Sequence, residues 1–385
     1  MVLKTVLTDG SGKGRVTKMV KVGFIGFGRM GITHFSILNT HPQVKIEAVC
    51  DQSSTMLKVL SKYVDVKTYT DYSKMLDEIQ LDCVIISTPG DSHAEIIKNC
   101  IQKGIHIFVE KPFTMTSAEG REIINLMEGK PIINQVGYVN RFNEVFVAVK
   151  QMVADGAIGD VVNFSSDMYA ATTLKDSKSS WRGKKKSGGG CMFEMASHCI
   201  DLVVYLFDKP DKVIGSIMQS IYSSEVEDLV SASFLYSNGC TGNIYVNWSD
   251  ETYRKPANIV KILGTKGKII ADKHAYKIYL KESDVKRGFE QGWNTRYITD
   301  FGKATRFYLR GNEFTNQLDY FIACINDKKY ENISSFSEAL KTDVIMDEIA
   351  QDAAGTISSM GDQSGTSIIH KKEQEKISIW KRIMK

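Results

Sequence analysis

The stretch GGGCMFEMASHCIDL, residues 188–202, places an acid and a histidine four residues apart behind three glycines. In an α-helix, Glu194, His198 and Asp201 would share one face, because side chains three, four and seven residues apart lie close together. The other faces of such a helix are apolar, and a polar stripe needs partners since burying it unpaired is costly. Histidine is well suited to proton transfer near neutral pH, so the stripe predicts acid–base chemistry.

Two further interpretations of this stretch stay open. An isolated histidine on a helix is most often structural, and the glycines before it allow either a ligand or the backbone to come close. Glu194 and His198 also have the spacing of a metal-binding pair, but no HExxH pattern and no evident third ligand accompany them. We therefore predict no metal site.

A second pattern, GFGRMG, follows a short apolar strand and opens a helical segment. Its glycines have the G-x-G-x-x-G spacing, and Asp51 stands twenty residues later at the end of the next strand, as a dinucleotide-binding turn requires. The helix N-terminus offers N–H groups to phosphates. A glycine turn in another α/β fold is the alternative. The predicted cofactor contacts in this turn are Gly26, Phe27, Gly28, Arg29, Met30 and Gly31.

The same region predicts which nicotinamide cofactor is bound. Asp51 can accept hydrogen bonds from both hydroxyls of the adenosine ribose, and its charge would repel a 2′-phosphate. Residues 52–55, QSST, contain no arginine to hold that phosphate. The sequence therefore favours NAD over NADP, although Lys58 leaves NADP open.

A lysine stands just past a strand in the stretch FVEKPF. Pro112 restricts the residues before it to extended geometry and ends the strand. Strand carboxyl ends in an open α/β sheet face the ligand crevice, so Lys111 is predicted to point to where a nicotinamide would lie. From its position alone, a surface lysine is the simpler interpretation.

Apolar strands alternate with helical segments through the first part of the chain. This alternation predicts a parallel sheet with helices on both faces, in a Rossmann domain spanning residues 20–140. The predicted strands cover residues 20–26, 44–51, 81–89, 105–112 and 131–139, and the helical segments include 30–39, 92–104 and 117–129.

The second part of the chain has a different pattern. A helix at about 143–155 precedes a series of strands with the hairpin turns YSNGC and GTKGK, and two helices follow at about 312–326 and 336–353. This predicts an α+β domain with an open, largely antiparallel sheet over residues 141–355. Residues 1–19 are predicted to form an N-terminal arm and residues 356–385 a polar, basic C-terminal tail.

Composition excludes several classes of protein. The chain has 385 residues, 43% of them apolar, and a net charge of +4 spread along its length, which gives no sign of nucleic-acid binding. Its seven cysteines form no CxxC pair and suit reduced, buried thiols. No apolar run approaches the roughly 20 residues that span a bilayer. We therefore expect a cytoplasmic protein that binds neither nucleic acid nor membrane.

The motifs together resemble one known family. The GFGRMG turn, STPGDSHAE, EKP, NRFN and GGG-x3-acid-x3-His occur in an order and spacing similar to the glucose–fructose oxidoreductase/inositol dehydrogenase family, Gfo/Idh/MocA, over residues 20–355. The resemblance implies NAD(P)-dependent oxidation of a sugar or cyclitol hydroxyl. It also implies a homodimer or homotetramer, in which the open sheet often forms the interface. The cofactor contacts that it adds are Ser87, Thr88, Pro89, His93, Glu110 and Lys111.

The resemblance also implies catalytic roles. Lys111 is the EKP lysine, and the family's Asp-x3-His is here Glu194-x3-His198, with one extra methylene in the acid. We predict that His198 is the general base for the substrate hydroxyl and that Lys111 stabilises the charge that develops on its oxygen. Glu194 is predicted to hold Lys111 or His198 in place, although its extra methylene leaves a substrate contact open. Lys111 as the acid–base group is the alternative.

The substrate is predicted to be a sugar, sugar nucleotide or cyclitol. A non-catalytic NAD(P)-binding regulator and an NAD-dependent glycoside hydrolase are alternatives on the same scaffold. Lysines in the GKKK loop can meet a phosphate or carboxylate on the substrate, or form a solvated loop. The predicted substrate contacts are Arg141, Asn143, Tyr169, Trp181, Arg182 and Lys186.

Overall fold

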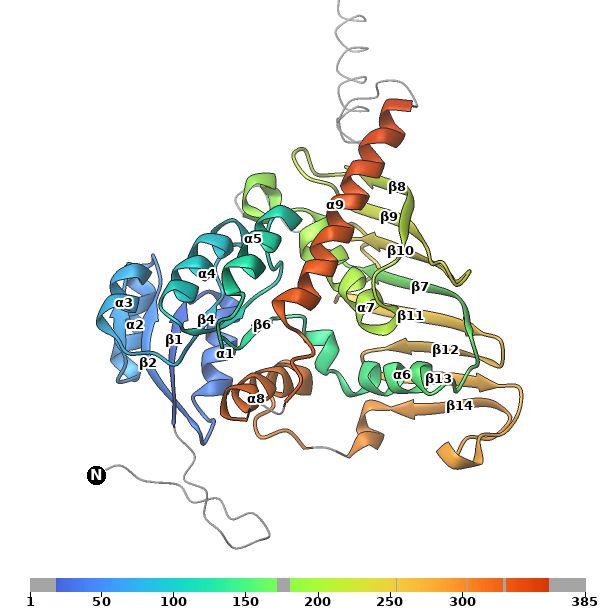
Figure 1. The fold of residues 1–385 in the computed structure, drawn as a ribbon, viewed down its shortest axis with the longest axis horizontal. Coiled ribbons are helices and arrows are strands. Elements are labelled where there is room, and N and C mark those ends of the chain that lie inside the picture. The colour runs from blue at the N-terminus through green and yellow to red at the C-terminus, as the bar shows by residue number, and fades with distance from the viewer. Residues whose placement is uncertain (1–18, 172–180, 254, 303, 328–329, 360–385) are drawn as a thin grey trace, which may run out of the picture. The chain divides into compact units, whose positions relative to one another are not determined.

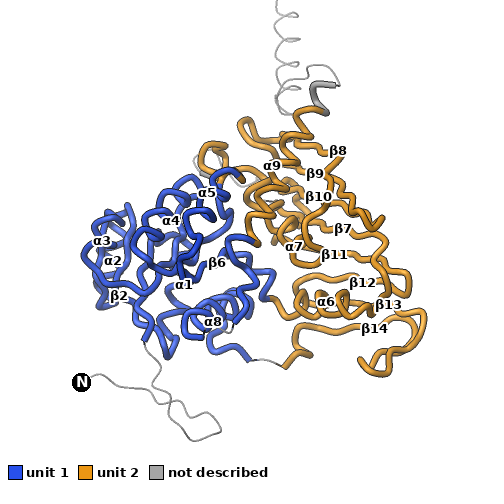
Figure 2. Tube along the Cα trace, viewed as in Figure 1, with its two compact units in different colours: residues 1–114, 118–142, 303–337 blue, residues 115–117, 143–302, 338–385 orange. Residues whose placement is uncertain are grey.

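The computed structural model describes residues 19–171, 181–253, 255–302, 304–327 and 330–359. The chain divides into two units, shown in different colours in Figure 2. Unit 1 comprises residues 1–114, 118–142 and 303–337, and unit 2 comprises residues 115–117, 143–302 and 338–385. The predicted arm, up to residue 18, and the predicted tail, from residue 360, lie outside the described residues.

The unit boundaries differ from the predicted domains in two main respects. Residues 115–117, predicted within the Rossmann domain, belong to unit 2. The sequence predicts a single second domain over residues 141–355, whereas residues 303–337 belong to unit 1. Helix α8 (Asn312–Asn326) lies in this segment. Its residues Leu318, Phe321 and Ile322 are fully buried in a cluster with the first sheet, and this burial holds the segment on unit 1.

Unit 1 contains a six-stranded sheet in the order β3-β2-β1-β4-β5-β6, and every strand pair is parallel. The strand order reverses between β1 and β4, so a ligand crevice is expected beyond the carboxyl ends of these two strands. The strands are β1 (Val20–Ile25), β2 (Val44–Cys50), β3 (Lys67–Tyr69), β4 (Cys83–Ile86), β5 (His106–Val109) and β6 (Asn134–Val136).

Helices connect these strands, as the alternation in the sequence predicts. Side chains of β1 and α1 share one buried cluster, in which Phe24 of the strand lies 5.5 Å from Phe35 of the helix between ring centroids. Helix α2 begins where Ser53 accepts a hydrogen bond from the Met56 N–H. The helices are α1 (Arg29–Leu38), α2 (Ser54–Tyr63), α3 (Tyr72–Glu78), α4 (His93–Gln102) and α5 (Ser117–Met127).

Unit 2 contains an eight-stranded sheet in the order β14-β13-β12-β11-β7-β10-β9-β8. Only β7 and β10 pair in parallel, so the sheet is largely antiparallel, which confirms the predicted fold class. Strands β3 and β14 were not anticipated from the sequence. The strands are β7 (Val161–Tyr169), β8 (Lys212–Gln219), β9 (Leu229–Leu235), β10 (Thr241–Asn247), β11 (Ala257–Gly264), β12 (Gly267–Asp272), β13 (Ala275–Leu280) and β14 (Gly292–Tyr297).

Three helices cover one face of this sheet, α6 (Glu144–Ala154), α7 (Ser197–Phe207) and α9 (Phe336–Ser359) (Figure 1). Among the described helices, the segment 185–207 alone is long and apolar enough to cross a membrane, and 78% of its most apolar window is buried inside the fold. All seven cysteines are buried and free.

Candidate functional site

The glycine turn of unit 1 is shaped by close packing on two sides. A side chain at Gly26, which has φ of 89°, would meet the Ser87 backbone at 2.7 Å, and one at Gly31 would collide with the Gly26 carbonyl. A side chain at Gly28 would meet nothing within 4 Å. Gly26 and Gly31 therefore fix the turn, and Gly28 leaves open space beside the N-terminus of α1, where a dinucleotide's phosphates fit.

Asp51 holds this turn in place. Its Oδ2 accepts a hydrogen bond from the Phe27 N–H at 2.6 Å, and its Oδ1 accepts one from the Ser53 N–H at 2.8 Å. A carboxylate oxygen has a second lone pair, so both oxygens can still accept from ribose hydroxyls. The structure thus gives Asp51 a positioning role in addition to the ribose contact predicted from the sequence.

The loop after β4 contributes a polar group that fits a ligand. The Ser87 hydroxyl is buried and has no hydrogen-bond partner among the described residues. The Thr88 side chain accepts a hydrogen bond from the Ser92 hydroxyl at 2.7 Å, which shapes the same loop. Because buried polar groups are normally paired, a ligand atom in the crevice is a suitable partner for Ser87. These residues fit a bound dinucleotide.

His93 links two loops of unit 1. The side chain is fully buried, with Nδ1 2.8 Å from the Pro112 carbonyl and Nε2 3.0 Å from the Thr88 carbonyl. The imidazole therefore links the loop after β4 to the residues that follow Lys111. The structure thus gives His93 a positioning role between these two loops, and the predicted contact with the cofactor stays a prediction.

Glu110 is held beside the crevice by a buried histidine. Its Oε1 lies 2.6 Å from Nε2 of His34, a fully buried residue on α1. A side chain at Gly137 would come within 3.1 Å of the Glu110 carboxyl, so both sides of this carboxyl are enclosed. Lys111 follows at the carboxyl end of β5, as predicted. The motifs in the sequence do not mark His34, because its role depends on a residue 76 positions away.

The polar stripe of unit 2 begins in an irregular helix. Met192–Ala196 form a π-helical turn in which the Ser197 N–H bonds to the Met192 carbonyl, five residues earlier, and α7 starts at Ser197. The regular spacing predicted between Glu194 and His198 is therefore interrupted. Both residues are half-buried. Single π-helical turns inside α-helices are frequent at functional sites.

Glu194 forms an ion pair with Arg182. The Arg182 Nε–H donates to Glu194 Oε2 at 2.8 Å, and the two side chains are 33% and 15% exposed. The structure thus joins a residue predicted to be catalytic and one predicted to bind substrate. Of the two roles left open for this acid, the contact favours the orientation of a neighbouring side chain.

The three glycines before the stripe are packed against protein atoms. Side chains at these positions would contact Met115 at Gly188, the Arg182 carbonyl at Gly189 and the Glu227 carboxyl at Gly190. Close packing within unit 2 therefore accounts for the glycines without a ligand.

Glu227 is a further residue that the sequence did not reveal. Its Oε1 accepts a hydrogen bond from the Met192 N–H at 2.7 Å, and its carbonyl accepts one from the Cys191 N–H at 3.0 Å. Both donors lie in the first turn of the helix, so Glu227 caps it from a distant loop. Burial raises the pKa of Glu227, and the bond from Met192 opposes that shift.

Two predicted substrate contacts are used by the chain itself. Arg141 and Asn143 are each 1% exposed. The Arg141 guanidinium donates to the Ile333 carbonyl at 2.6 Å, and Asn143 caps α6 by accepting from the Val145 N–H at 3.0 Å. We therefore leave Arg141 and Asn143 out of the proposed substrate site.

The other predicted substrate contacts differ in position. Met168 packs under the helices, so the next residue, Tyr169, lies on the opposite face of the sheet from α7, where it stacks on Tyr253 at 4.9 Å. Lys186 is exposed. The Trp181 side chain lies outside the described part of the chain. Arg182 pairs with a stripe residue, Glu194.

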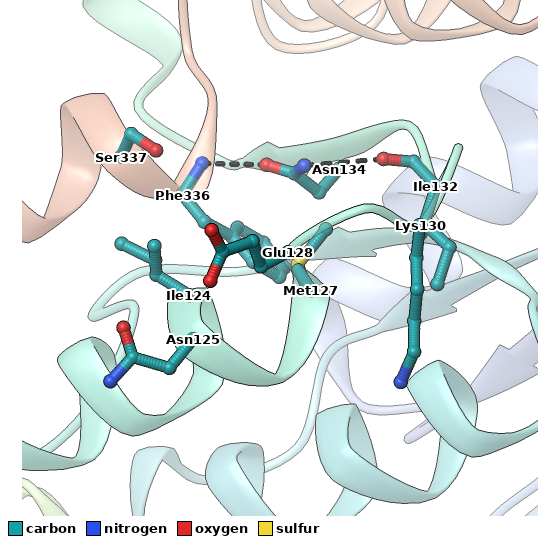
Figure 3. Close-up of a pocket in the computed structure, with 9 residues that line it drawn as sticks. All are labelled: Ile124, Asn125, Met127, Glu128, Lys130, Ile132, Asn134, Phe336 and Ser337. Atoms are coloured by element: carbon teal, nitrogen blue, oxygen red, sulfur yellow. Dashed lines mark hydrogen bonds between the residues drawn. The ribbon is translucent and has the colours of Figure 1, made fainter.

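A pocket of about 520 Å³ lies elsewhere in unit 1 (Figure 3). It is formed by the end of α5, the start of α9 and the residues that lead into β6, where Asn134 accepts a hydrogen bond from the Phe336 N–H at 2.7 Å. These residues precede β6, whereas the crevice lies beyond the carboxyl ends of the strands. The pocket is therefore separate from the candidate cofactor site. Within the described ranges, no His, Cys, Asp and Glu side chains are grouped to hold a metal ion.

Comparisons with known proteins agree with this geometry. A model of the Gfo/Idh/MocA oxidoreductase family, with an NAD-binding Rossmann fold, matches residues 20–138, and a model of the Gfo/Idh/MocA C-terminal domain matches residues 146–270. An uncharacterized oxidoreductase of Schizosaccharomyces pombe is 30% identical over 217 residues, which are 54% of this chain and 58% of that protein. The scyllo-inositol 2-dehydrogenase (NADP(+)) of Bacillus subtilis is 25% identical over 56% of this chain and 59% of its own length.

The fold also matches a solved structure over most of its length. Levoglucosan dehydrogenase in complex with NADH and levoglucosan has a TM-score of 0.77 at 20% sequence identity, covering 88% of this chain and 98% of that chain. The sequence matches to the two relatives span little more than half of each relative. The two family models match parts of both units, up to residue 270.

Proposed function

Because the chain belongs to the Gfo/Idh/MocA oxidoreductase family, we propose that it is an NAD-dependent dehydrogenase that acts on a hydroxyl of a sugar, sugar nucleotide or cyclitol. The observation that carries this proposal is the half-buried acid and histidine on the helix of unit 2, in a chain whose first unit has an open dinucleotide turn. The proteins named above include a scyllo-inositol 2-dehydrogenase and, among the solved structures, a levoglucosan dehydrogenase.

The residues of unit 1 are suited to hold the cofactor. Gly28 and the N-terminus of α1 receive the phosphates, Asp51 receives the adenosine ribose, and Ser87 and Lys111 lie where the nicotinamide half would be held. When bound, the cofactor supplies the hydride acceptor. Asp51 supports NAD over NADP, and the inositol dehydrogenase of B. subtilis uses NADP. Measuring the affinities for NADH and NADPH decides between the two.

The residues of unit 2 are suited to move a proton. We assign His198 as the base that removes the proton from the substrate hydroxyl, with Lys111 stabilising the charge on that oxygen. The Glu194–Arg182 pair keeps the acid at a defined place near the histidine. General-base catalysis of this kind contributes about 10²–10⁴-fold to the rate.

NADH formation tests the proposal directly. The purified protein is mixed with NAD⁺ and with inositols, aldoses, sugar acids or sugar nucleotides, and absorbance of NADH is followed. We expect signal from one class, and His198→Asn should lower it about 10²–10⁴-fold. His274→Asn is the matched control, because His274 is exposed in the same unit. Confirmed NAD⁺ binding with no NADH from any class would point to the regulator, and released sugar without NADH to the glycoside hydrolase.

The predicted homodimer or homotetramer and the predicted cytoplasmic location also stay proposals. Light scattering of the purified protein measures its mass in solution and tests the first. Fractionation of cells that express the full chain tests the second.

A further inference from the structure

A segment from late in the chain runs along helix α1 of the cofactor-binding unit. The Arg306 guanidinium bonds to the Ile37 carbonyl at 3.1 Å and to the Thr40 hydroxyl, both at the carboxyl end of α1. The next residues alternate, with Phe307 and Leu309 packed on the buried cluster of unit 1 and Tyr308 74% exposed. The backbone bends at Arg306, Phe307, Leu309 and Arg310, so the segment follows the surface of this cluster without forming a strand.

The course of helix α8 shows which end of α1 this segment leads to. Helix α8 begins two residues after Arg310 and lies beside α1. Its Asp319 is 3.8 Å from His41, and its last residue donates to Gln43, so α8 runs past the carboxyl end of α1. The start of α8, with Arg310 before it, therefore lies back towards the amino end of α1, where Gly28 leaves open space.

The backbone at Arg310 is held in an uncommon conformation. Arg310 has φ of 67° and Gly311 has φ of 141°. For a residue other than glycine, this region costs about 1–2 kcal/mol. A side chain at Gly311 would meet the Glu313 carboxyl at 2.5 Å, and the Arg310 guanidinium lies 5.4 Å from the centre of the Phe314 ring. The positive φ and the contact with the Phe314 ring therefore fix the direction of the Arg310 side chain, although this backbone conformation is unfavourable for arginine.

Arg29 and Glu110 are the charged residues that act on Arg310. Burial and the field of Arg29 lower the pKa of Arg310, whereas Glu110 raises it. The Glu110 carboxyl already lies 2.6 Å from His34. Two guanidinium groups that act on each other beside an open helix N-terminus form a site for an anion, because an anion there offsets their repulsion.

We propose that Arg310 binds the pyrophosphate of the nicotinamide cofactor together with Arg29, from a segment that follows the glycine turn by some 280 residues. The inference rests on the cofactor binding proposed above and adds to it a residue outside the dinucleotide fingerprint. A guanidinium group donates paired N–H hydrogen bonds to phosphate oxygens. Two guanidinium groups can therefore bind the two phosphates of a diphosphate better than one group can.

The test measures binding instead of turnover. Arg310→Asn removes the cation but keeps the turn, because asparagine tolerates positive φ. Arg310→Lys keeps the positive charge but lacks the paired N–H donors of the guanidinium group. Lys130→Gln removes one exposed positive charge from the opposite edge of the same sheet and is the matched control. Each variant is titrated calorimetrically with adenosine, ADP, NADH and NADPH, and its melting temperature is recorded.

We expect Arg310→Asn to bind ADP and NADH about 10- to 100-fold more weakly than the unmodified protein, the range for loss of a hydrogen bond to a charged group. Adenosine affinity and the ratio of NADH to NADPH affinity should not change, Arg310→Lys should lose less, and Lys130→Gln should bind like the unmodified protein. An equal loss for adenosine, or a larger loss for NADPH than for NADH, overturns the assignment to the pyrophosphate.

The two proposals fail in different ways. If the unmodified protein binds neither ADP nor NADH, the cofactor proposal is wrong. If it binds both and Arg310→Asn binds them equally well, the cofactor proposal stands and the assignment of Arg310 is wrong.

Discussion

Replacing His93 by leucine removes a side chain that contacts both the Thr88 and the Pro112 carbonyls, at 3.0 and 2.8 Å. Carbonyl oxygens only accept hydrogen bonds, so a neutral imidazole, with its single N–H, satisfies one of them at a time. Its loss should leave a buried carbonyl unpaired at a cost of about 1–3 kcal/mol. For a unit of this size, each kcal/mol lowers the melting temperature by roughly 2–4 °C.

The effect of His93 should depend on pH. Burial holds the pKa of His93 below its ordinary value, and the bonds to Pro112 and Thr88 oppose that shift. The folded protein therefore favours the neutral ring, whereas the unfolded chain protonates near pH 6.5. The resulting stability is fully present above the unfolded pKa and is lost as the pH falls through the lower folded pKa.

Unfolding by heat or urea from about pH 5 to pH 8 measures this contribution. Compared with the unmodified protein, His93→Leu should be less stable at neutral pH and should lose less stability on acidification. His93→Gln, which keeps an N–H donor, should recover part of the loss, and the exposed His274→Gln should behave like the unmodified protein. The reasoning is refuted if His93→Leu matches the unmodified protein in both stability and pH dependence.

Other side chains give independent tests. Lys111→Met should bind NAD⁺ almost unchanged in titrations while lowering turnover at least about 100-fold, and normal turnover would remove Lys111 from the catalytic centre. Glu194→Asp should break the contact with Arg182 and lower turnover with little change in cofactor affinity, and kinetics equal to the unmodified protein would show that the pair is not needed. Glu227→Gln should stabilise the protein increasingly as pH rises, because a raised carboxyl pKa makes the ionised form unfavourable when folded; a stability difference that does not change with pH, measured by urea unfolding, would contradict this.

The sequence predicts those parts of the site that depend on neighbouring residues. The spacing of Gly26, Gly28 and Gly31 is set by one turn and one helix start, so the pattern alone locates the crevice. Lys111 follows a strand and precedes a proline, which places it at the correct edge of the sheet. Local sequence patterns likewise predict that the first sheet is parallel and that the second is largely antiparallel. Edge strand β3 has only three residues, and edge strand β14 has no fully buried residue, so neither carries a clear apolar pattern.

The remaining features depend on contacts between distant residues. His93 lies in the predicted motif, but its partner Pro112 is 19 residues away. The motif therefore predicts a histidine near the cofactor but cannot reveal that its side chain links two loops. The start of the helix in unit 2 is likewise held from a distance, because Glu227 accepts the Met192 N–H from 35 residues away and Gly190 packs on its carboxyl. The motif also does not reveal the π-helical turn over Met192–Ala196. Because a single extra residue in a helical turn rotates everything before it, this turn changes the position of Glu194 relative to His198. The acid's reach therefore follows from the turn as well as from the length of its side chain.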